Sequence, residues 1–191
     1  MERPFFTVVM PAYGVERYLQ DAVESIREQT FTDWELVIVD DGSPDGTGGL
    51  ADRMEKQDDR VCVIHHTENR GLSEARNTGI DAAKGRYIWF MDPDDRVDSD
   101  LLEKVYLSLK ENPAHLVIFG HTEEYYDADG SLNYTHRILP EKKRFSTKGE
   151  LRPYVIRLEQ ETIYGYACNN MYTLDYIRDK KLRFETVTLI E

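Results

Sequence analysis

The sequence has few cysteines and no long apolar segment. Its 191 residues include only two cysteines, Cys62 and Cys168, without CxxC spacing. Two cysteines are too few for a disulfide framework or a structural zinc site, so a reducing compartment is the simpler expectation. No apolar run approaches the roughly 18 residues that cross a bilayer, and the run at residues 5–10 is too short for a signal peptide core. We therefore expect a cytoplasmic segment.

Positive charge is also scarce. Lysine and arginine number 24 against 36 aspartates and glutamates, which gives a formal net charge of −12. A field of this sign repels nucleic acid, so no nucleic-acid partner is expected. Hydrophobic residues make up 40% of the chain, which with glycine added is the composition of a globular protein and excludes intrinsic disorder.

Apolar runs and helical stripes alternate over the first 120 residues. The runs are the length of strands buried on both faces of a sheet, and they lie at residues 5–10, 35–39, 61–65, 87–91 and 116–120. Apolar residues at helical spacing separate them, at residues 19–26, 50–54, 72–83 and 101–109. This alternation predicts an α/β fold with a mainly parallel sheet flanked by helices.

The pattern changes after residue 120. Two strand-like segments at residues 122–126 and 132–138 flank a turn, which predicts a β-hairpin. Thr147 and Glu150 have the spacing of a capping box, so we expect a helix to begin there. A weaker helical stretch covers residues 175–180. A small α/β segment therefore follows the parallel part.

Carboxylates follow two of the predicted strands. Asp40 and Asp41 follow the second strand, and Asp92, Asp94 and Asp95 follow the fourth. Single aspartates at such places often form turns, but each close pair of carboxylates repels by about 4 kcal/mol at an effective dielectric of 20. Mg²⁺ or Mn²⁺ relieves this repulsion and completes its shell with phosphate oxygens. The carboxyl edge of the sheet is therefore predicted to bind a nucleoside diphosphate through a divalent cation.

Four motifs in a fixed order carry a family resemblance. They are Val8-Val9-Met10-Pro11-Ala12-Tyr13, Val39-Asp40-Asp41-Gly42-Ser43, residues 71–79 and Asp92-Pro93-Asp94-Asp95. With them the sequence resembles the inverting family 2 glycosyltransferases of the GT-A fold, of the bacterial cell-surface polysaccharide type. The resemblance implies a nucleotide-sugar-binding part at residues 1–120 and an acceptor-side part of the same domain at residues 121–191.

The resemblance also implies roles for individual residues. Tyr13 and Asp41 would line a uracil pocket, and Asp92 would contact the ribose. Asp94 would hold Mn²⁺ or Mg²⁺, with Asp95 beside the metal. The nucleotide contacts implied in this way are Pro11, Tyr13, Asp41, Arg76 and Asp92. Arg76 either braces the diphosphate or only anchors its helix to the neighbouring loop.

A reaction and its partners follow from the resemblance. A sugar would pass from a UDP-sugar to a hydroxyl of a glycan or lipid-linked acceptor, and the full-length protein could associate peripherally with the inner face of the membrane. Glu191 resembles the first member of a Glu-Asp pair whose aspartate is the general base. We therefore expect the chain to be truncated one residue before that base. The alternative is that Glu191 is itself the base or only a polar chain end.

Other interpretations stay open beside this one. The chain could bind a nucleotide sugar without transferring it, or it could be a sugar nucleotidyltransferase, although residues 11–14 supply no positive charge for that chemistry. Gly46 to Ala51 matches a dinucleotide fingerprint, but residues 40–45 separate it from its strand, which argues against an NAD-linked enzyme. The basic run at residues 142–144 is either a solvated loop or a surface for phosphate-bearing acceptors or membranes.

Overall fold

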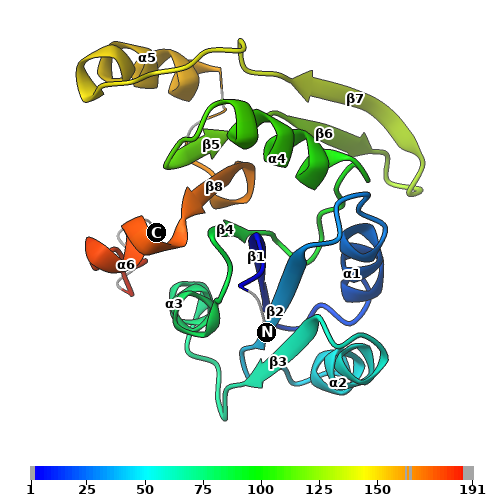
Figure 1. Cartoon of the computed structure of the whole chain (residues 1–191). Coiled ribbons are helices and arrows are strands. Elements are labelled where there is room, and N and C mark those ends of the chain that lie inside the picture. Colours follow the sequence, from blue (N-terminus) through cyan, green and yellow to red (C-terminus); the bar gives the residue numbers. More distant parts are fainter. Residues whose placement is uncertain (1–2, 162, 164, 187–191) are drawn as a thin grey trace. The chain divides into compact units, whose positions relative to one another are not determined.

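A six-stranded sheet organises the chain. The computed structural model describes residues 3–161, 163 and 165–186, and the sheet has the order β3-β2-β1-β4-β8-β5 (Figure 1). The pairs β1–β2, β1–β4 and β2–β3 are parallel, whereas β8 runs antiparallel to β4. The strands are β1 (Phe6–Ala12), β2 (Trp34–Asp40), β3 (Val61–His65), β4 (Tyr87–Phe90), β5 (Leu116–Ile118) and β8 (Asn170–Thr173). The predicted mainly parallel α/β sheet is confirmed.

Helices cover both faces of the parallel strands. In Figure 1, α1 and α2 lie on one side of the sheet and α3 on the other. Each helix buries an apolar stripe, and α1 does so at the predicted positions Leu19, Ala22, Val23 and Ile26. The helices of this part are α1 (Leu19–Arg27), α2 (Thr47–Gln57), α3 (Leu72–Ala82), α4 (Leu101–Glu111) and α6 (Leu174–Asp179).

Two elements differ from the sequence prediction. Helix α2 begins at Thr47, before the predicted helical segment at residues 50–54, and runs through Gly48 and Gly49. A Cβ on Gly48 would lie 2.5 Å from an Asp40 carboxylate oxygen, so this glycine lets the helix approach the end of β2. Strand β8 was not predicted, because its four residues are too short for a periodic pattern.

The chain divides into two compact units, one of residues 1–116 with 171–191 and one of residues 117–170. In the second unit, β6 (His121–Tyr126) and β7 (Leu132–Ile138) form the predicted antiparallel hairpin. Helix α5 (Lys148–Gln160) begins as predicted, with the Glu150 amide donating to the Thr147 hydroxyl. The short 3-10 helix η1 (Ala167–Asn169) follows later. Ile138, Leu158 and Ile163 form the core of this unit.

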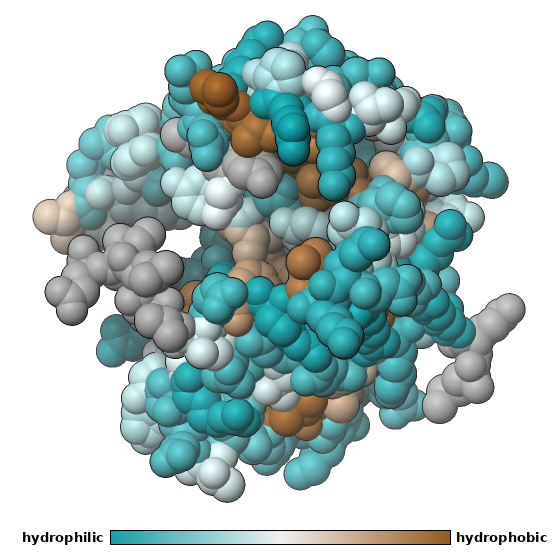
Figure 2. Space-filling model, turned by 90° about the vertical axis from the view of Figure 1, so that its left-hand side faces the viewer, coloured by the Kyte–Doolittle hydropathy of each residue, from teal (hydrophilic) through white to brown (hydrophobic). Residues whose placement is uncertain are grey.

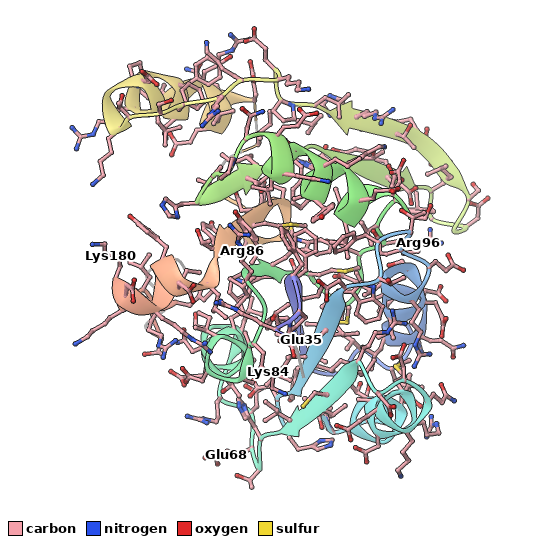
Figure 3. The ribbon with its side chains drawn as sticks, in the orientation of Figure 1. Glu35, Glu68, Lys84, Arg86, Arg96 and Lys180 are labelled. Atoms are coloured by element: carbon pink, nitrogen blue, oxygen red, sulfur yellow. The ribbon has the colours of Figure 1, made fainter. Side chains whose placement is uncertain are left out.

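The face drawn in Figure 2 is mostly hydrophilic, with separate hydrophobic patches. No helix in the described part of the chain is long and apolar enough to span a membrane. At the edge of the sheet where the parallel strands begin, the Glu35 carboxylate accepts hydrogen bonds from the Thr7 hydroxyl and the Lys84 amide, both at 2.6 Å (Figure 3). Hydrogen bonds within the chain satisfy the Glu35 carboxylate at this edge. The aspartates that follow β2 and β4 lie at the opposite edge, where the parallel strands end.

Candidate nucleotide-binding edge

Three neighbouring strands end at one edge of the first unit. Because the sheet order is β2-β1-β4, the residues that follow these strands are brought side by side. Asp41 follows β2, Tyr13 follows β1, and Asp92 follows the end of β4. The carboxyl edge of a parallel sheet is the usual ligand position in open α/β folds. These three residues come from three of the four motifs, and the fourth motif, residues 71–79, contacts Asp41 and Asp92.

Hydrogen bonds join the loops after β1 and β2. The Gly14 amide donates to the Ser43 hydroxyl at 3.2 Å, and the Val15 amide donates to the Thr47 hydroxyl at 3.0 Å. The Ser43 amide donates in turn to Asp40, whose other carboxylate oxygen lies 2.8 Å from His65 Nδ1. Burial alone would raise the pKa of Asp40, but these hydrogen bonds hold it below its ordinary value. Asp40 is thus a structural anion that organises the edge.

Asp41 is the most enclosed carboxylate at this edge, with 3% of its surface exposed. One oxygen accepts the Arg70 amide at 2.9 Å and lies 2.5 Å from His66 Nδ1. The other oxygen accepts the Gly71 amide at 2.8 Å. A carboxylate offers about four lone-pair sites, so one acceptor site stays open. Asp41 can therefore fix the loop before α3 and still accept one N–H from a ligand.

Gly42 allows the close packing beside Asp41. Its φ is +68°, a conformation that side-chain-bearing residues adopt at a cost. A Cβ there would lie 2.7 Å from the carbonyl carbon of Glu68 and 2.9 Å from the Asn69 nitrogen. Glycine is therefore needed at this position, because the backbone is left-handed and because no room exists for a Cβ beside Glu68.

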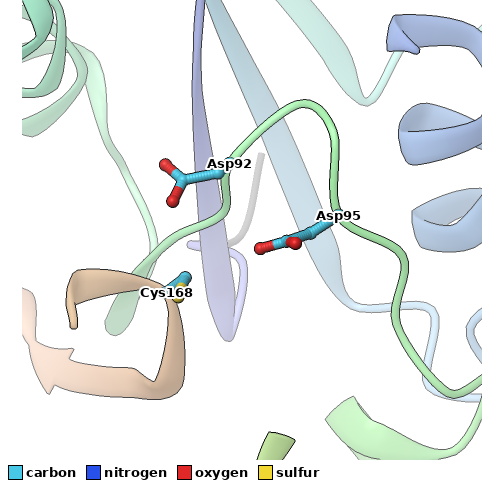
Figure 4. Close-up of side chains that lie close together, drawn as sticks. All are labelled: Asp92, Asp95 and Cys168. Atoms are coloured by element: carbon cyan, nitrogen blue, oxygen red, sulfur yellow. The ribbon is translucent and has the colours of Figure 1, made fainter. Parts of the chain in front are cut away.

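The loop after β4 supplies the second acidic group. A carboxylate oxygen of Asp92 and one of Asp95 lie within 4.8 Å of each other (Figure 4). Burial, followed by the negative charges of Asp92 and Asp94, raises the pKa of Asp95 to about 6. The repulsion inferred from the sequence is therefore present in the folded chain, and oxygen donors of this kind suit a hard divalent cation.

Arg76 approaches the same loop from α3. Its guanidinium donates to an Asp92 oxygen at 3.0 Å and lies 5.2 Å from the centre of the Phe184 ring. The Nε–H of Arg76 is buried and has no acceptor among the described residues. Arg76 therefore anchors the loop after β4 and places positive charge beside Asp92.

The structure places the other predicted residues as follows. Pro11 is buried inside β1, opposite Val39, so it shapes the strand end. Tyr13 is 50% exposed directly after β1, with its ring accessible to a ligand. The Asp94 residue is exposed on its loop. Glu191 lies outside the described residues.

Two further residues belong to this edge. His66 lies between Asp41 and the Thr78 hydroxyl, with its Nε2 2.9 Å from the latter. The sequence showed it only as one of two adjacent histidines, although its place directly after a strand was a usable signal. Phe184 reaches Arg76 from the far end of the chain, and no local pattern marks that contact.

Comparison with known proteins identifies the class of protein. The chain matches Glycosyl transferase family 2 over residues 7–173, and it belongs to this family. It is 32% identical over 182 residues to the uncharacterized glycosyltransferase EpsJ of Bacillus subtilis. The aligned region covers 95% of this chain and 52% of EpsJ. It is 41% identical over 141 residues to the putative teichuronic acid biosynthesis glycosyltransferase TuaG of the same species, covering 69% of this chain and 56% of TuaG. The chain thus spans about half the length of these relatives.

Solved structures agree on the fold. The crystal structure of S. aureus TarS 1-349 superposes with a TM-score of 0.75 at 20% identity, covering 95% of this chain and 50% of that one. TarS 1-349 has also been solved in complex with UDP and with UDP-GlcNAc. The predicted GT-A fold is confirmed.

Proposed function

We propose that this chain is the donor-binding part of an inverting glycosyltransferase. It would bind a UDP-sugar at the carboxyl edge formed by β2, β1 and β4, and the sugar would pass to a hydroxyl of a glycan or a lipid-linked acceptor. The convergence of Asp41, Tyr13, Asp92 and Asp95 at one edge is the observation that carries this proposal. It agrees with membership of the family.

The geometry suggests a task for each group. The open acceptor site of Asp41 can receive the N–H of a uracil base, and the exposed Tyr13 ring can stack on that base. Asp92 can accept a ribose hydroxyl, while the Arg76 guanidinium, which lies 3.0 Å from Asp92, supplies positive charge beside the diphosphate. A positive group near the departing diphosphate favours the transition state, because negative charge develops there.

A divalent cation fits the acidic loop. Asp94 and Asp95 would hold Mn²⁺ or Mg²⁺, with Asp92 beside them, since three carboxylates lie within the four residues 92–95. The negative charges of Asp92 and Asp94 add to burial in raising the pKa of Asp95. When bound, such a cation neutralises diphosphate charge and lets an acidic protein attract an anionic donor. The acceptor hydroxyl would attack the anomeric carbon opposite the bond to UDP, so that the configuration inverts as that bond breaks. The proton of this hydroxyl needs a general base. We propose that the base is Glu191 or the aspartate of the Glu-Asp pair that Glu191 resembles. In the same scheme, residues 1–120 serve the donor and residues 121–191 the acceptor.

Thermal unfolding with a panel of nucleotides tests the proposal. Ligands that bind only the folded state raise the midpoint in proportion to their affinity. We expect UDP and at least one UDP-sugar to raise Tm in the presence of Mn²⁺, whereas ADP-sugars and GDP-sugars have smaller effects. Equal shifts for all three nucleotide classes would contradict a uracil pocket. No shift with any of them would contradict donor binding altogether.

A further inference from the structure

The second unit carries a concentration of positive charge that the donor site does not use. Its cations are Lys142, Lys143, Arg144, Lys148 and Arg152, called here the basic face of α5, and all five are exposed. Between Lys142 and Ile156 the only carboxylate is Glu150, so this segment has a net charge of +4 in a chain of −12. The charge of the molecule is therefore strongly polarised along the sequence.

Contacts within the unit hold the basic loop against the helix (Figure 1). The Lys143 ammonium lies 4.2 Å from the centre of the Tyr154 ring, and the Phe145 ring lies 5.1 Å from it. The Tyr154 hydroxyl donates to the Glu141 carboxylate. Tyr154 of α5 thus fixes the loop that contains Lys142 and Arg144, and the cations of loop and helix form one surface.

Helical spacing adds an exposed apolar residue to the same face. Lys148, Arg152 and Ile156 follow one another at intervals of four, so they share one side of α5. Ile156 is 62% exposed, whereas Leu158 on the opposite side is buried in the core. Leu139, at the start of the basic loop, is also 62% exposed.

Two carboxylates near these cations are engaged elsewhere, whereas Glu159 is exposed on the same side of α5 as Lys148 and Arg152. Glu150 accepts the Ser146 amide at 2.7 Å, and Glu141 is bonded to Tyr154. The Arg157 guanidinium forms an ion pair with the Glu161 carboxylate, with Nε 2.7 Å from Oε1, so Arg157 is not included in the basic face of α5. Within the described part of the chain, Lys142, Lys148 and Arg152 have no ion-pair partner. These three cations are available to an external anion.

We propose that the basic face of α5 docks the protein on the surface of an anionic lipid bilayer. Cations flanked by exposed aliphatic residues suit an interface in which headgroups carry the charge and acyl chains begin just below. The overall charge of −12 does not prevent this, because charges farther than about 8 Å from the lipid are screened at physiological salt.

Vesicle cosedimentation of the 191-residue chain tests the proposal. We expect binding to phosphatidylcholine vesicles containing about 30% phosphatidylglycerol and none to pure phosphatidylcholine, with release as NaCl rises from about 50 to about 500 mM. Lys142→Gln, Lys148→Gln and Arg152→Gln together should lower the partition coefficient at least about ten-fold. The matched control is Arg17→Gln, Lys56→Gln and Lys110→Gln, which removes the same charge from exposed sites of the first unit and should change binding less than about two-fold.

The proposal is overturned if the chain does not bind anionic vesicles, if both triple variants lose binding equally, or if neutral vesicles are bound equally well. Retention on duplex DNA at least as strong as on the vesicles would indicate a general polyanion surface and would also reject it. Ile156→Ser should weaken vesicle binding at about 50 mM NaCl, because it removes an apolar contact with the bilayer. UDP binding, measured on the same variants, should stay unchanged, so that failure of membrane docking is distinguishable from failure of the proposed donor site.

Discussion

Asn77 and Phe184, which are 107 residues apart, are joined by two hydrogen bonds. The Asn77 side-chain nitrogen donates to the Phe184 carbonyl at 3.0 Å, and the Phe184 amide donates to the Asn77 side-chain oxygen at 2.9 Å. This pairing places the Phe184 ring 4.9 Å from Phe90 and 5.2 Å from the Arg76 guanidinium. A segment near the end of the described chain is thereby fixed beside the candidate donor site.

Asn77→Ala should release this segment. The variant removes two hydrogen bonds and leaves the part-buried Phe184 amide unpaired, so we expect the free energy of unfolding to fall by about 1–3 kcal/mol. Urea denaturation measures the loss, and hydrogen exchange at the Phe184 amide should accelerate more than exchange in β1. Ser73→Ala on the same helix is the control and should shift stability by less than about 0.5 kcal/mol. Unchanged exchange at Phe184 would mean that the pairing does not hold the segment.

Gly42→Ala should be strongly destabilising. The left-handed backbone costs about 1–2 kcal/mol for a residue with a Cβ, and the contact with Glu68 backbone adds to it. Gly130→Ala separates the two causes, because Gly130 has a φ of +83° but nothing within 4 Å of the added Cβ. Chemical denaturation of both variants should give the larger loss for Gly42→Ala. Equal losses would show that the packing against Glu68 contributes nothing.

Stability should depend on pH through His65. Hydrogen bonds to Asp40 and then to Asp52 raise the pKa of His65 above its ordinary value of 6.5. The charged imidazole therefore stabilises the fold fully below pH 6.5, and this contribution is lost as pH rises through the raised pKa. His65→Gln should remove that part of the slope, and Asp52→Asn should reduce it. Urea midpoints at pH 6 and pH 8.5 measure the effect, and an unaltered slope in His65→Gln would assign it to other groups.

Asp41→Asn should affect both folding and binding. The asparagine side chain has an NH₂ group in place of one carboxylate oxygen, so it cannot accept hydrogen bonds from the Arg70 and Gly71 backbone amides on two oxygens. The free energy of unfolding should therefore fall by about 1–3 kcal/mol. Affinity for uridine should fall together with affinity for UDP, because the proposed contact is to the base. Calorimetry on the folded variant checks this, with Asp33→Asn, an exposed site, as the control. Loss of UDP binding with uridine binding intact would contradict the role of Asp41 at the base.

Periodic patterns predicted most of the parallel sheet. The strands β1 to β4 and the helices α1, α3 and α4 have apolar residues at the spacing that burial requires. Aspartates directly after strands also located the candidate site, since strand ends of a parallel sheet share an edge.

What the sequence could not predict depends on contacts between distant residues. β8 has only four residues, and its burial follows from pairing with β4. The start of α2 at Thr47 depends on the space that Gly48 leaves for Asp40. The enclosure of Asp41 by His66 and the Asn77–Phe184 pairing join segments 25 and 107 residues apart, which no local window detects.

Calorimetric titration of UDP in the presence and absence of Mn²⁺ tests the central claim most directly. The account predicts that UDP binds with Mn²⁺ and much more weakly in excess chelator, and that Asp94→Asn or Asp95→Asn removes most of this difference. Asp98→Asn, an exposed site just beyond the loop, should behave as the unaltered protein. If UDP binds equally tightly in chelator, or if Asp95→Asn leaves the Mn²⁺ dependence intact, the acidic loop after β4 is not a cation site for the donor.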